Sequence, residues 1–318
     1  EKYEEGGKAW LGEEVIAAVP TNNGDILITT YKSKTRTLRF IRYGMTGDGK
    51  MTEMRHTFED LKGYDEYSFK FTNLKTASPI FHVGALVFDP PGELLTTGNS
   101  DFGAFYLGSV DFDKNALKFT KYAPTESQVN ALFGKSELQN VGFKYLYSDE
   151  STNRILAVFE EAREYIKPLS QSIVRPPGDK PGFVEINPFG VNSKQNRTTY
   201  SANNILLTSF DMGHNLIWER GINKETKAYN HLELGCATSV RPNNTLSLWY
   251  PSNEGLHFVE MDLATGKRLS SMNKEILVSF FNVYFLPPFS VLDKNNNLYF
   301  VAQYGQSGGD SYLLKVSK

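Results

Sequence analysis

Six short apolar runs recur along this chain, and each follows a turn rich in Asn, Asp, Gly or Pro. The runs begin at Ile26, Leu94, Ile155, Ile205, Leu246 and Leu298. The first and last starts lie 272 residues apart, so the mean spacing is about 54 residues, close to one sixth of the 318 residues. A strand–turn–strand unit repeated at such a period is typical of propeller blades.

Further strand patterns flank each run, as a four-stranded blade requires. In the first unit, residues 37–43 alternate apolar and polar side chains, residues 44–49 form a turn, and residues 51–58 return. Helix signals are few, with a short helix expected at residues 126–133. The apolar stretches before the runs would be innermost strands that line a central channel, at residues 15–19, 83–88, 141–147, 237–240 and 289–292. We therefore predict an all-β, six-bladed propeller with four-stranded antiparallel blades around a central channel.

The whole chain, residues 1–318, is predicted to form one propeller domain, because each blade buries its faces only against its neighbours. Residues 1–12 are expected to help close the ring beside the last strand, at residues 312–316. Residues 168–199 show little periodicity, and we interpret them as a long loop with one hairpin at residues 182–186. We expect the protein to be a monomer.

The composition excludes several classes of protein. Charge is balanced, with 34 Lys and Arg against 36 Asp and Glu and a pI near 6.3, so a nucleic-acid partner has no electrostatic support. The apolar stretches are far shorter than the roughly 18 residues of a membrane-spanning helix, so we expect no transmembrane segment. The single cysteine, Cys236, excludes an intrachain disulfide and a cysteine-rich zinc site.

The sequence contains no complete catalytic motif. Residues 44–50 match most of a phosphate-binding loop, but Met51 stands where Ser or Thr would bind magnesium, and strand patterns flank the segment. We therefore predict a plain hairpin turn there. No Gly-x-Ser-x-Gly motif occurs. Cys236 begins a predicted inner strand without a positive neighbour that would activate its thiol, so we expect a small buried residue.

Polar residues at strand ends form the candidate ligand site. His82 begins a predicted inner strand, and His214 follows a strand end. Because strand ends gather near the axis of a propeller, we expect a channel mouth that docks a small molecule, a glycan or a protein partner. A lone histidine at a strand end also fits a structural role, and that alternative stays open. The residues expected at the mouth are Glu14, His82, Asn140, Asp211 and His214.

One alternative is a divalent-metal-dependent, lactonase-like hydrolase. Several oxygen donors that converge at the axis would suit Ca²⁺ or another divalent cation, with His82 or His214 as the base. The candidate ligands are Glu13, Asp101, Asn140 and Asp211. Residues 11–13 resemble the opening of the calcium-dependent lactonase and phosphotriesterase propellers, but the Asn-Gly pairs of those families are missing from the later inner strands. In the other interpretation these acids are solvated strand ends or turn caps, and no cofactor is needed.

Three parts of the chain carry a family resemblance: residues 141–147 followed by 155–159, residues 261–267 (Met-Asp-Leu-Ala-Thr-Gly-Lys) and residues 291–299. Together they resemble the TolB-like six-bladed propellers among lipoproteins of Bacteroidetes. The resemblance spans most of the chain at the level of blade pattern. It implies a periplasmic or cell-surface location, or secretion as the alternative, with a lipid-anchored Cys upstream of residue 1 and no established catalytic function.

The leading hypothesis from the sequence is an extracytoplasmic binding module rather than an enzyme, with a ligand docked at a mouth of the channel. A propeller presents many loops on a rigid frame, which suits binding without chemistry. The metal-dependent hydrolase is one alternative. A protein–protein scaffold that uses blade edges and residues 168–199 is the other.

Overall fold

The structure is a computed structural model in which strands dominate. Besides the strands, the described residues form one α-helix, α2 (Glu126–Phe133), and one short 3₁₀ helix, η1 (Ser33–Thr35). The described residues are 13–21, 24–44, 50–59, 66–72, 80–88, 102–167, 197–224, 226–229, 236–241, 243–252, 255–274, 283–292, 298–304 and 311–316.

The described strands form five antiparallel sheets, in which neighbouring strands also follow one another in the chain except that β13 pairs with β11. The first sheet contains β1 (Glu14–Pro20), β2 (Ile26–Lys32), β3 (Thr37–Tyr43) and β4 (Met51–Thr57). The second contains β5 (Glu66–Thr72), β6 (Ile80–Phe88), β7 (Phe102–Asp111) and β8 (Ala116–Tyr122). The third contains β9 (Val141–Asp149), β10 (Arg154–Lys167), β11 (Arg197–Phe210) and β12 (Leu216–Ile222), with β13 (Thr226–Tyr229) paired to β11.

The fourth sheet contains β14 (Ala237–Val240), β15 (Thr245–Ser252), β16 (Gly255–Asp262) and β17 (Arg268–Lys274). The fifth contains β18 (Val283–Leu292), β19 (Leu298–Tyr304) and β20 (Ser311–Val316). A series of four-stranded meanders is the strand order of propeller blades. The predicted all-β, propeller-like fold is therefore confirmed.

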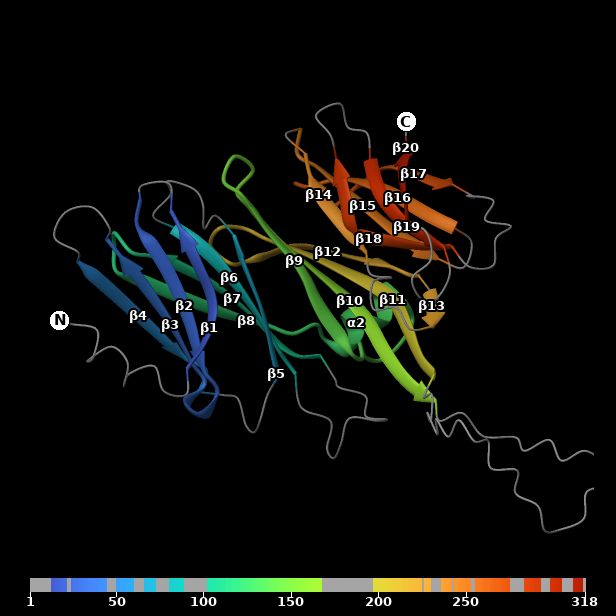
Figure 1. Ribbon diagram of the computed structural model, residues 1–318. Coiled ribbons are helices and arrows are strands. Elements are labelled where there is room, and N and C mark those ends of the chain that lie inside the picture. Colours follow the sequence, from blue (N-terminus) through green and yellow to red (C-terminus); the bar gives the residue numbers. More distant parts are fainter. Residues whose placement is uncertain are drawn as a thin grey trace, which may run out of the picture.

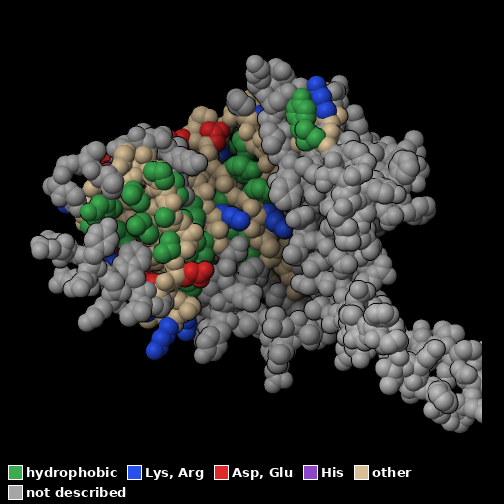
Figure 2. Space-filling model, viewed as in Figure 1, with side chains coloured by type: hydrophobic (Ala, Val, Ile, Leu, Met, Phe, Trp, Pro, Cys, Tyr) green, Lys and Arg blue, Asp and Glu red, His purple; other side chains and the backbone are tan. Residues whose placement is uncertain are grey.

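The sheets follow one another in space in chain order (Figure 1). The first sheet and the fifth sheet lie at opposite ends of the array, so their described strands are not neighbours. The predicted closure through residues 1–12 falls outside the described residues. On the face seen in Figure 2, Lys and Arg side chains lie near the centre with acidic side chains above and below them, in keeping with the balanced charge.

The six apolar runs do not mark six separate sheets. The runs that begin at Ile155 and Ile205 lie in β10 and β11, which pair with each other in the third sheet, with Glu160 opposite Ile205. The two runs therefore belong to one sheet, and their 50-residue spacing does not mark a separate blade. The described residues thus form five sheets, and a count of six blades is not confirmed.

One predicted inner strand occupies a different position. Residues 83–88 belong to β6, which is the second strand of its sheet because β5 lies before it in the order. The sequence analysis did not predict β5. The predicted inner strands at residues 15–19, 141–147, 237–240 and 289–292 do fall in the first strands of their sheets, β1, β9, β14 and β18.

Apolar layers fill the spaces between successive sheets. Leu27, Phe40 and Phe81 belong to a layer between the first and second sheets. A second layer lies between the second and third sheets, and a third lies between the third and fourth. Sheets that bury both faces against their neighbours explain why residues 155–161 of β10 are all buried.

Helix α2 has the predicted bounds, residues 126–133, and lies against β12 at the edge of the third sheet. It begins with a capping box, in which Thr125 accepts a hydrogen bond from the backbone of Gln128, and it ends at Gly134 in the left-handed conformation. Phe133 of the helix lies so close to Gly221 of β12 that an added Cβ would sit 2.8 Å from the ring. Within the described part of the chain, no helix has the length and apolarity to span a membrane.

Candidate functional site

The two acidic residues predicted at the start of β1 lie in the first sheet. Glu14 is exposed. The Glu13 carboxylate accepts a hydrogen bond from Thr30 Oγ1 at 2.9 Å and pairs with Arg39 Nη1 at 3.4 Å. Arg39 also pairs with Glu53 at 2.7 Å. Glu13 is thus part of an ion-pair network on the face of the first sheet.

Asn140 and Asp211 have local structural roles. Asn140 precedes β9 with a φ of 52°, a left-handed conformation that Asn tolerates. Asp211 accepts hydrogen bonds from the backbone of Asn215 at 2.8 Å and from its side chain at 2.9 Å, and these bonds lower the pKa of the Asp211 carboxyl. Asp101 lies outside the described residues. Among the residues that the structure describes, no group of three or more His, Cys, Asp or Glu side chains is arranged to hold a metal ion.

His82 and His214 come together, but in the interior. Their ring centroids lie 6.3 Å apart, and the residues are 3% and 4% exposed. His82 is on β6, and His214 is in the turn between β11 and β12. Burial lowers the pKa of each imidazole to about 4. The sequence analysis placed both residues among five at an exposed channel mouth, whereas the structure places these two in the interior.

Two further sequence interpretations are confirmed. Strands β3 and β4 pair directly, with Tyr43 opposite Met51, and Gly44 N–H donates to the carbonyl of Lys50 at 3.0 Å, so the phosphate-loop-like segment is a hairpin connection. Cys236 is 1% exposed, and burial raises the pKa of its thiol. A thiol held in the neutral form is a packing group rather than a nucleophile.

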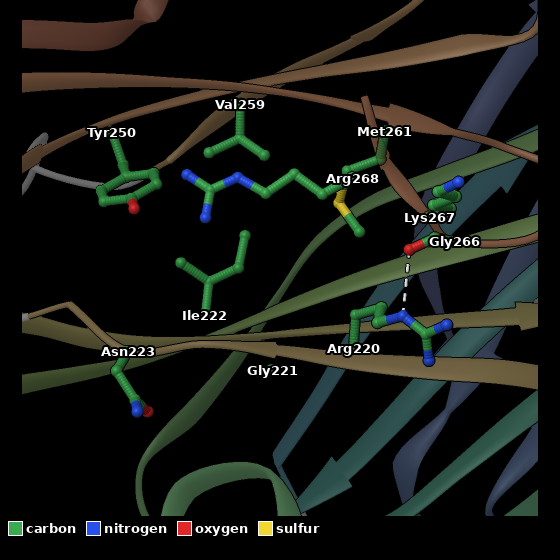
Figure 3. Close-up of a pocket in the computed structure, with 10 residues that line it drawn as sticks. All are labelled: Arg220, Gly221, Ile222, Asn223, Tyr250, Val259, Met261, Gly266, Lys267 and Arg268. Carbon is green, nitrogen blue, oxygen red and sulfur yellow. Dashed lines mark hydrogen bonds between the residues drawn. The ribbon is translucent and has the colours of Figure 1, made fainter. Parts of the chain in front are cut away.

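A cavity of about 510 Å³ opens between the third and fourth sheets, where the sequence predicted no site (Figure 3). This volume is within the range of small-molecule sites in proteins. One wall is the end of β12 and the residues after it, and the other is formed by β15, β16 and the turn into β17. We call it the inter-sheet pocket; it is lined by Arg220, Gly221, Ile222, Asn223, Tyr250, Val259, Met261, Gly266, Lys267 and Arg268.

The inter-sheet pocket is positively charged. Three of its ten described lining residues are basic, namely Arg220, Lys267 and Arg268, and none is acidic. The Arg268 side chain runs between Val259 and Ile222 with its guanidinium group toward Tyr250 (Figure 3). Among the described residues, no carboxylate pairs with Arg268.

Arg220 holds the two walls of the pocket together. Its Nε donates to the carbonyl of Gly266 at 2.9 Å, and its Nη2 donates to the carbonyl of Thr265 at 3.3 Å. Both acceptors lie in the turn between β16 and β17, while Arg220 is on β12. Arg220 uses carbonyl oxygens rather than carboxylates, so its positive charge is retained at the pocket.

A buried ion pair lies behind the pocket. Lys224 Nζ contacts the Glu160 carboxylate, and both side chains are 0% exposed. Lys144 Nζ lies 3.4 Å from Glu160, and the backbone N–H of Cys236 donates to both carboxylate oxygens at 3.0 Å. A buried carboxylate persists only when it is paired and hydrogen-bonded in this way. Because Lys224 Nζ also lies 5.7 Å from the centre of the Tyr250 ring, the pair and the pocket share a wall.

The phenol of Tyr250 is placed between apolar and basic surroundings. Burial raises the pKa of its hydroxyl, and the nearby Arg268 guanidinium lowers it. The hydroxyl therefore stays protonated at neutral pH and can donate a hydrogen bond. A donor beside a guanidinium group that pairs with no carboxylate in the described part of the chain is suited to a carboxylate or phosphate oxygen.

Sequence reasoning missed the pocket because its two walls come from different sheets. Arg220 and Arg268 are 48 residues apart, and no motif links them. The only local signal is the Lys267–Arg268 pair after a Gly-containing turn, which by itself indicates a solvated hairpin. Finding the pocket requires knowing that β12 lies beside the β16–β17 turn.

Comparisons with known proteins add little to this description. No family model matches the chain, and no curated protein matches it. Among solved structures, a propeller described as that of Dos1 is similar, with a TM-score of 0.24 and 8% sequence identity, over 96% of this chain and 70% of that one. A similarity at this TM-score carries no argument about function, and the fold assignment depends on the sheets themselves.

Proposed function

We propose that this protein is a binding module whose ligand site is the inter-sheet pocket, and that the ligand is a small molecule with one anionic group and an apolar body. The observation that carries the proposal is the set of three basic side chains without an acidic one in the described lining. A propeller-like fold is compatible with such a role, because rigid sheets hold the two walls of a cavity in fixed positions.

The chemistry of the lining supports this class of ligand. Arg268 and the Tyr250 hydroxyl supply donors that suit carboxylate or phosphate oxygens. Ile222, Val259 and Met261 provide an apolar surface beside these donors. Burial of an apolar chain against them adds about 25 cal/mol for each Å² removed from water.

Octanoate is a suitable probe, and calorimetric titration is the measurement. We expect octanoate to bind, octylamine not to bind, and octan-1-ol to bind more weakly because it lacks the charge. Arg268→Gln should weaken octanoate binding by about tenfold or more, since a hydrogen bond to a charged group contributes about 1.5–3 kcal/mol. The matched control is Lys34→Gln, which removes an exposed cation in η1 and should leave binding unchanged.

Two results would contradict the proposal. One is equal binding of octanoate and octylamine, which would mean that the charge of the pocket plays no part. The other is octanoate affinity that is the same in Arg268→Gln and the wild type, with both chains folded by circular dichroism.

The location outside the cytoplasm and the TolB-like, lipoprotein-type identity belong to the same proposal. They are supported by the blade pattern of the sequence and by a fold that suits binding. Fractionation of cells that express the complete gene tests them, and a product confined to the cytoplasmic fraction would contradict them.

A further inference from the structure

Two buried histidines lie at a distance from the inter-sheet pocket, between the second and third sheets. His82 is on β6, where it is paired with Thr72 of β5 and Ser109 of β7. His214 is in the turn that joins β11 to β12, and its backbone N–H donates a hydrogen bond to the backbone carbonyl of Asp211 at 2.9 Å. Both residues are more than nine-tenths buried.

Each of these imidazoles has a buried ring nitrogen that finds no hydrogen-bond partner among the described residues. The atoms are Nδ1 of His82 and Nε2 of His214. The other nitrogen of His214, Nδ1, lies 3.2 Å from Thr120 Oγ1 on β8. If Nδ1 carries the proton and donates it to Thr120, then Nε2 presents a lone pair to the interior. An unsatisfied buried nitrogen costs free energy unless a ligand occupies it.

This arrangement has the features of a metal-binding imidazole. A histidine that binds a metal usually donates its second ring N–H to an oxygen acceptor, which fixes the ring and the tautomer. Thr120 is placed to accept such a bond from His214. Metal–nitrogen distances are about 2.0–2.1 Å, so rings whose centroids are 6.3 Å apart can be bridged by one ion when their nitrogens face it.

The charged surroundings are compatible with a cation. Asp211, in the same turn, attracts positive charge at His214. Lys118 of β8 opposes it, but its ammonium group donates to the carbonyl of Gly213 at 2.6 Å.

We propose that His82 and His214 bind one transition-metal ion of the Zn²⁺, Ni²⁺ and Cu²⁺ group between the second and third sheets. Imidazole nitrogen suits these ions, whereas Ca²⁺ and Mg²⁺ prefer oxygen. Two protein ligands leave coordination positions for water, so binding is weaker than at a four-ligand structural zinc site. The proposal is independent of the anion-binding role of the inter-sheet pocket.

The experiment titrates the metal-free chain with Zn²⁺, and measures the bound metal by mass spectrometry and the melting temperature with and without a chelator. We expect one zinc ion per chain and a rise in melting temperature that Mg²⁺ and Ca²⁺ do not produce. His82→Gln and His214→Gln should each weaken zinc binding by more than about tenfold, the smallest loss usual for removing even an outer partner of a metal ligand. His257→Gln, which removes a histidine stacked on Tyr250, should bind zinc like the wild type.

A second measurement on the unaltered chain covers the case in which the His82 or His214 variants do not fold. The electron paramagnetic resonance spectrum of one equivalent of Cu²⁺ should show coupling to two imidazole nitrogens. Absence of both stoichiometric zinc and this coupling would overturn the proposal and assign the space between the rings to water. Unchanged zinc affinity in folded His82→Gln and His214→Gln would also overturn it.

Discussion

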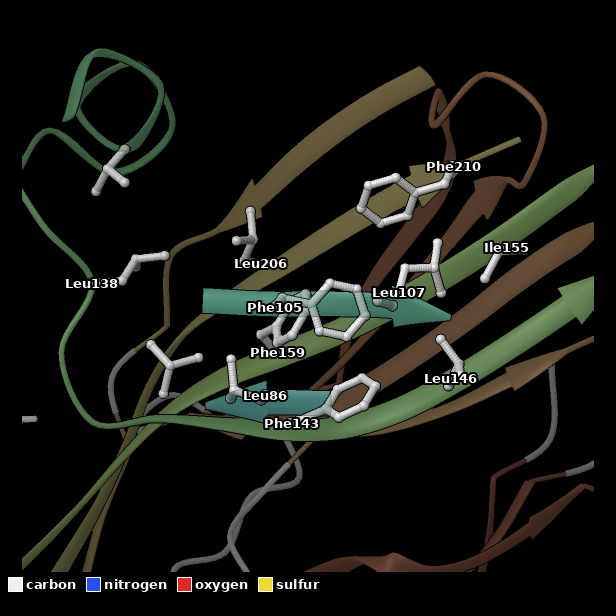
Figure 4. Close-up of a cluster of buried hydrophobic side chains, with 13 residues drawn as sticks. Leu86, Phe105, Leu107, Leu138, Phe143, Leu146, Ile155, Phe159, Leu206 and Phe210 are labelled. Atoms are coloured by element: carbon white, nitrogen blue, oxygen red, sulfur yellow. The ribbon is translucent and has the colours of Figure 1, made fainter. Parts of the chain in front are cut away.

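The third sheet packs against its two neighbours in different ways. Toward the second sheet it meets a dense aromatic layer, in which the Phe105 ring lies 5.0 Å from Phe159 and 5.2 Å from Phe143 (Figure 4). Toward the fourth sheet it meets a buried ion pair and a positively charged pocket. The layer toward the second sheet is rich in aromatic rings, whereas the layer toward the fourth sheet combines apolar packing with charged groups and a cavity. Among the described residues, the ligand-sized cavity therefore lies on the side of the fourth sheet, and we propose that side for binding.

Alternating side chains of β10 point to opposite faces of the third sheet, so this one strand packs against both neighbouring sheets. Ile155, Ala157 and Phe159 pack in the layer toward the second sheet. Leu156 and Val158 pack in the layer toward the fourth sheet, which is the period of two expected of a strand. Glu160 continues the second series, and its carboxylate therefore meets Lys224 on the side of the pocket.

The largest expected effect comes from breaking the buried ion pair between Glu160 and Lys224. Glu160→Gln leaves the fully buried Lys224 without its carboxylate, and we expect a loss of about 3–5 kcal/mol in the free energy of unfolding, measured by urea denaturation. The double variant Glu160→Gln/Lys224→Met removes both charges and should recover a large part of that loss. If the single variant were as stable as the wild type, the ion pair would not hold this interface.

A smaller effect is expected on the aromatic side. An added Cβ at Gly84 of β6 would lie 2.5 Å from the Phe143 ring, so Gly84→Ala should cost about 1–3 kcal/mol of unfolding free energy through overpacking. Gly142 is a matched control on β9, because the nearest atom to an added Cβ is 3.6 Å away. Equal stability of the Gly84→Ala and Gly142→Ala variants in urea would show that the interface between the second and third sheets is not closely packed.

The third expected effect is a gradual loss of folding stability as the pH falls. The pKa of both His82 and His214 is about 4 in the folded chain, against 6.5 as the ordinary value, so the unfolded chain binds more protons. Stability should be full above pH 6.5, fall as the pH drops, and stop responding to these groups below pH 4. Urea denaturation between pH 7 and pH 4 measures this, and His82→Gln should flatten the curve. A wild-type curve without slope in this window would contradict the burial of the pair.

Much of the fold can be predicted from the sequence because strands and turns are local. The alternation in residues 37–43 and the helix expected at residues 126–133 each correspond to an observed element, β3 and α2. The number of sheets could not be predicted from the sequence in the same way. The spacing between Ile155 and Ile205 resembles that of a repeat. The pairing of β10 with β11 nevertheless places both runs in one sheet. Strand pairing over such a distance cannot be recognised from the local sequence.

The candidate sites show the same limit. His82 and His214 could be grouped from their positions at strand ends, but their burial depends on how the second and third sheets pack. The inter-sheet pocket could not be predicted, because Arg220 and Arg268 come together only through the approach of β12 to the β16–β17 turn. Properties that depend on contacts between sheets are absent from the residue pattern of any one strand.

The most direct test of the account is a crystal structure of the wild-type chain with octanoate. The account predicts the carboxylate beside Arg268 and the Tyr250 hydroxyl, with the alkyl chain along Ile222 and Val259. Octanoate bound only at the strand ends around Glu14 and Asp211, with the space between the third and fourth sheets filled by side chains, would contradict it.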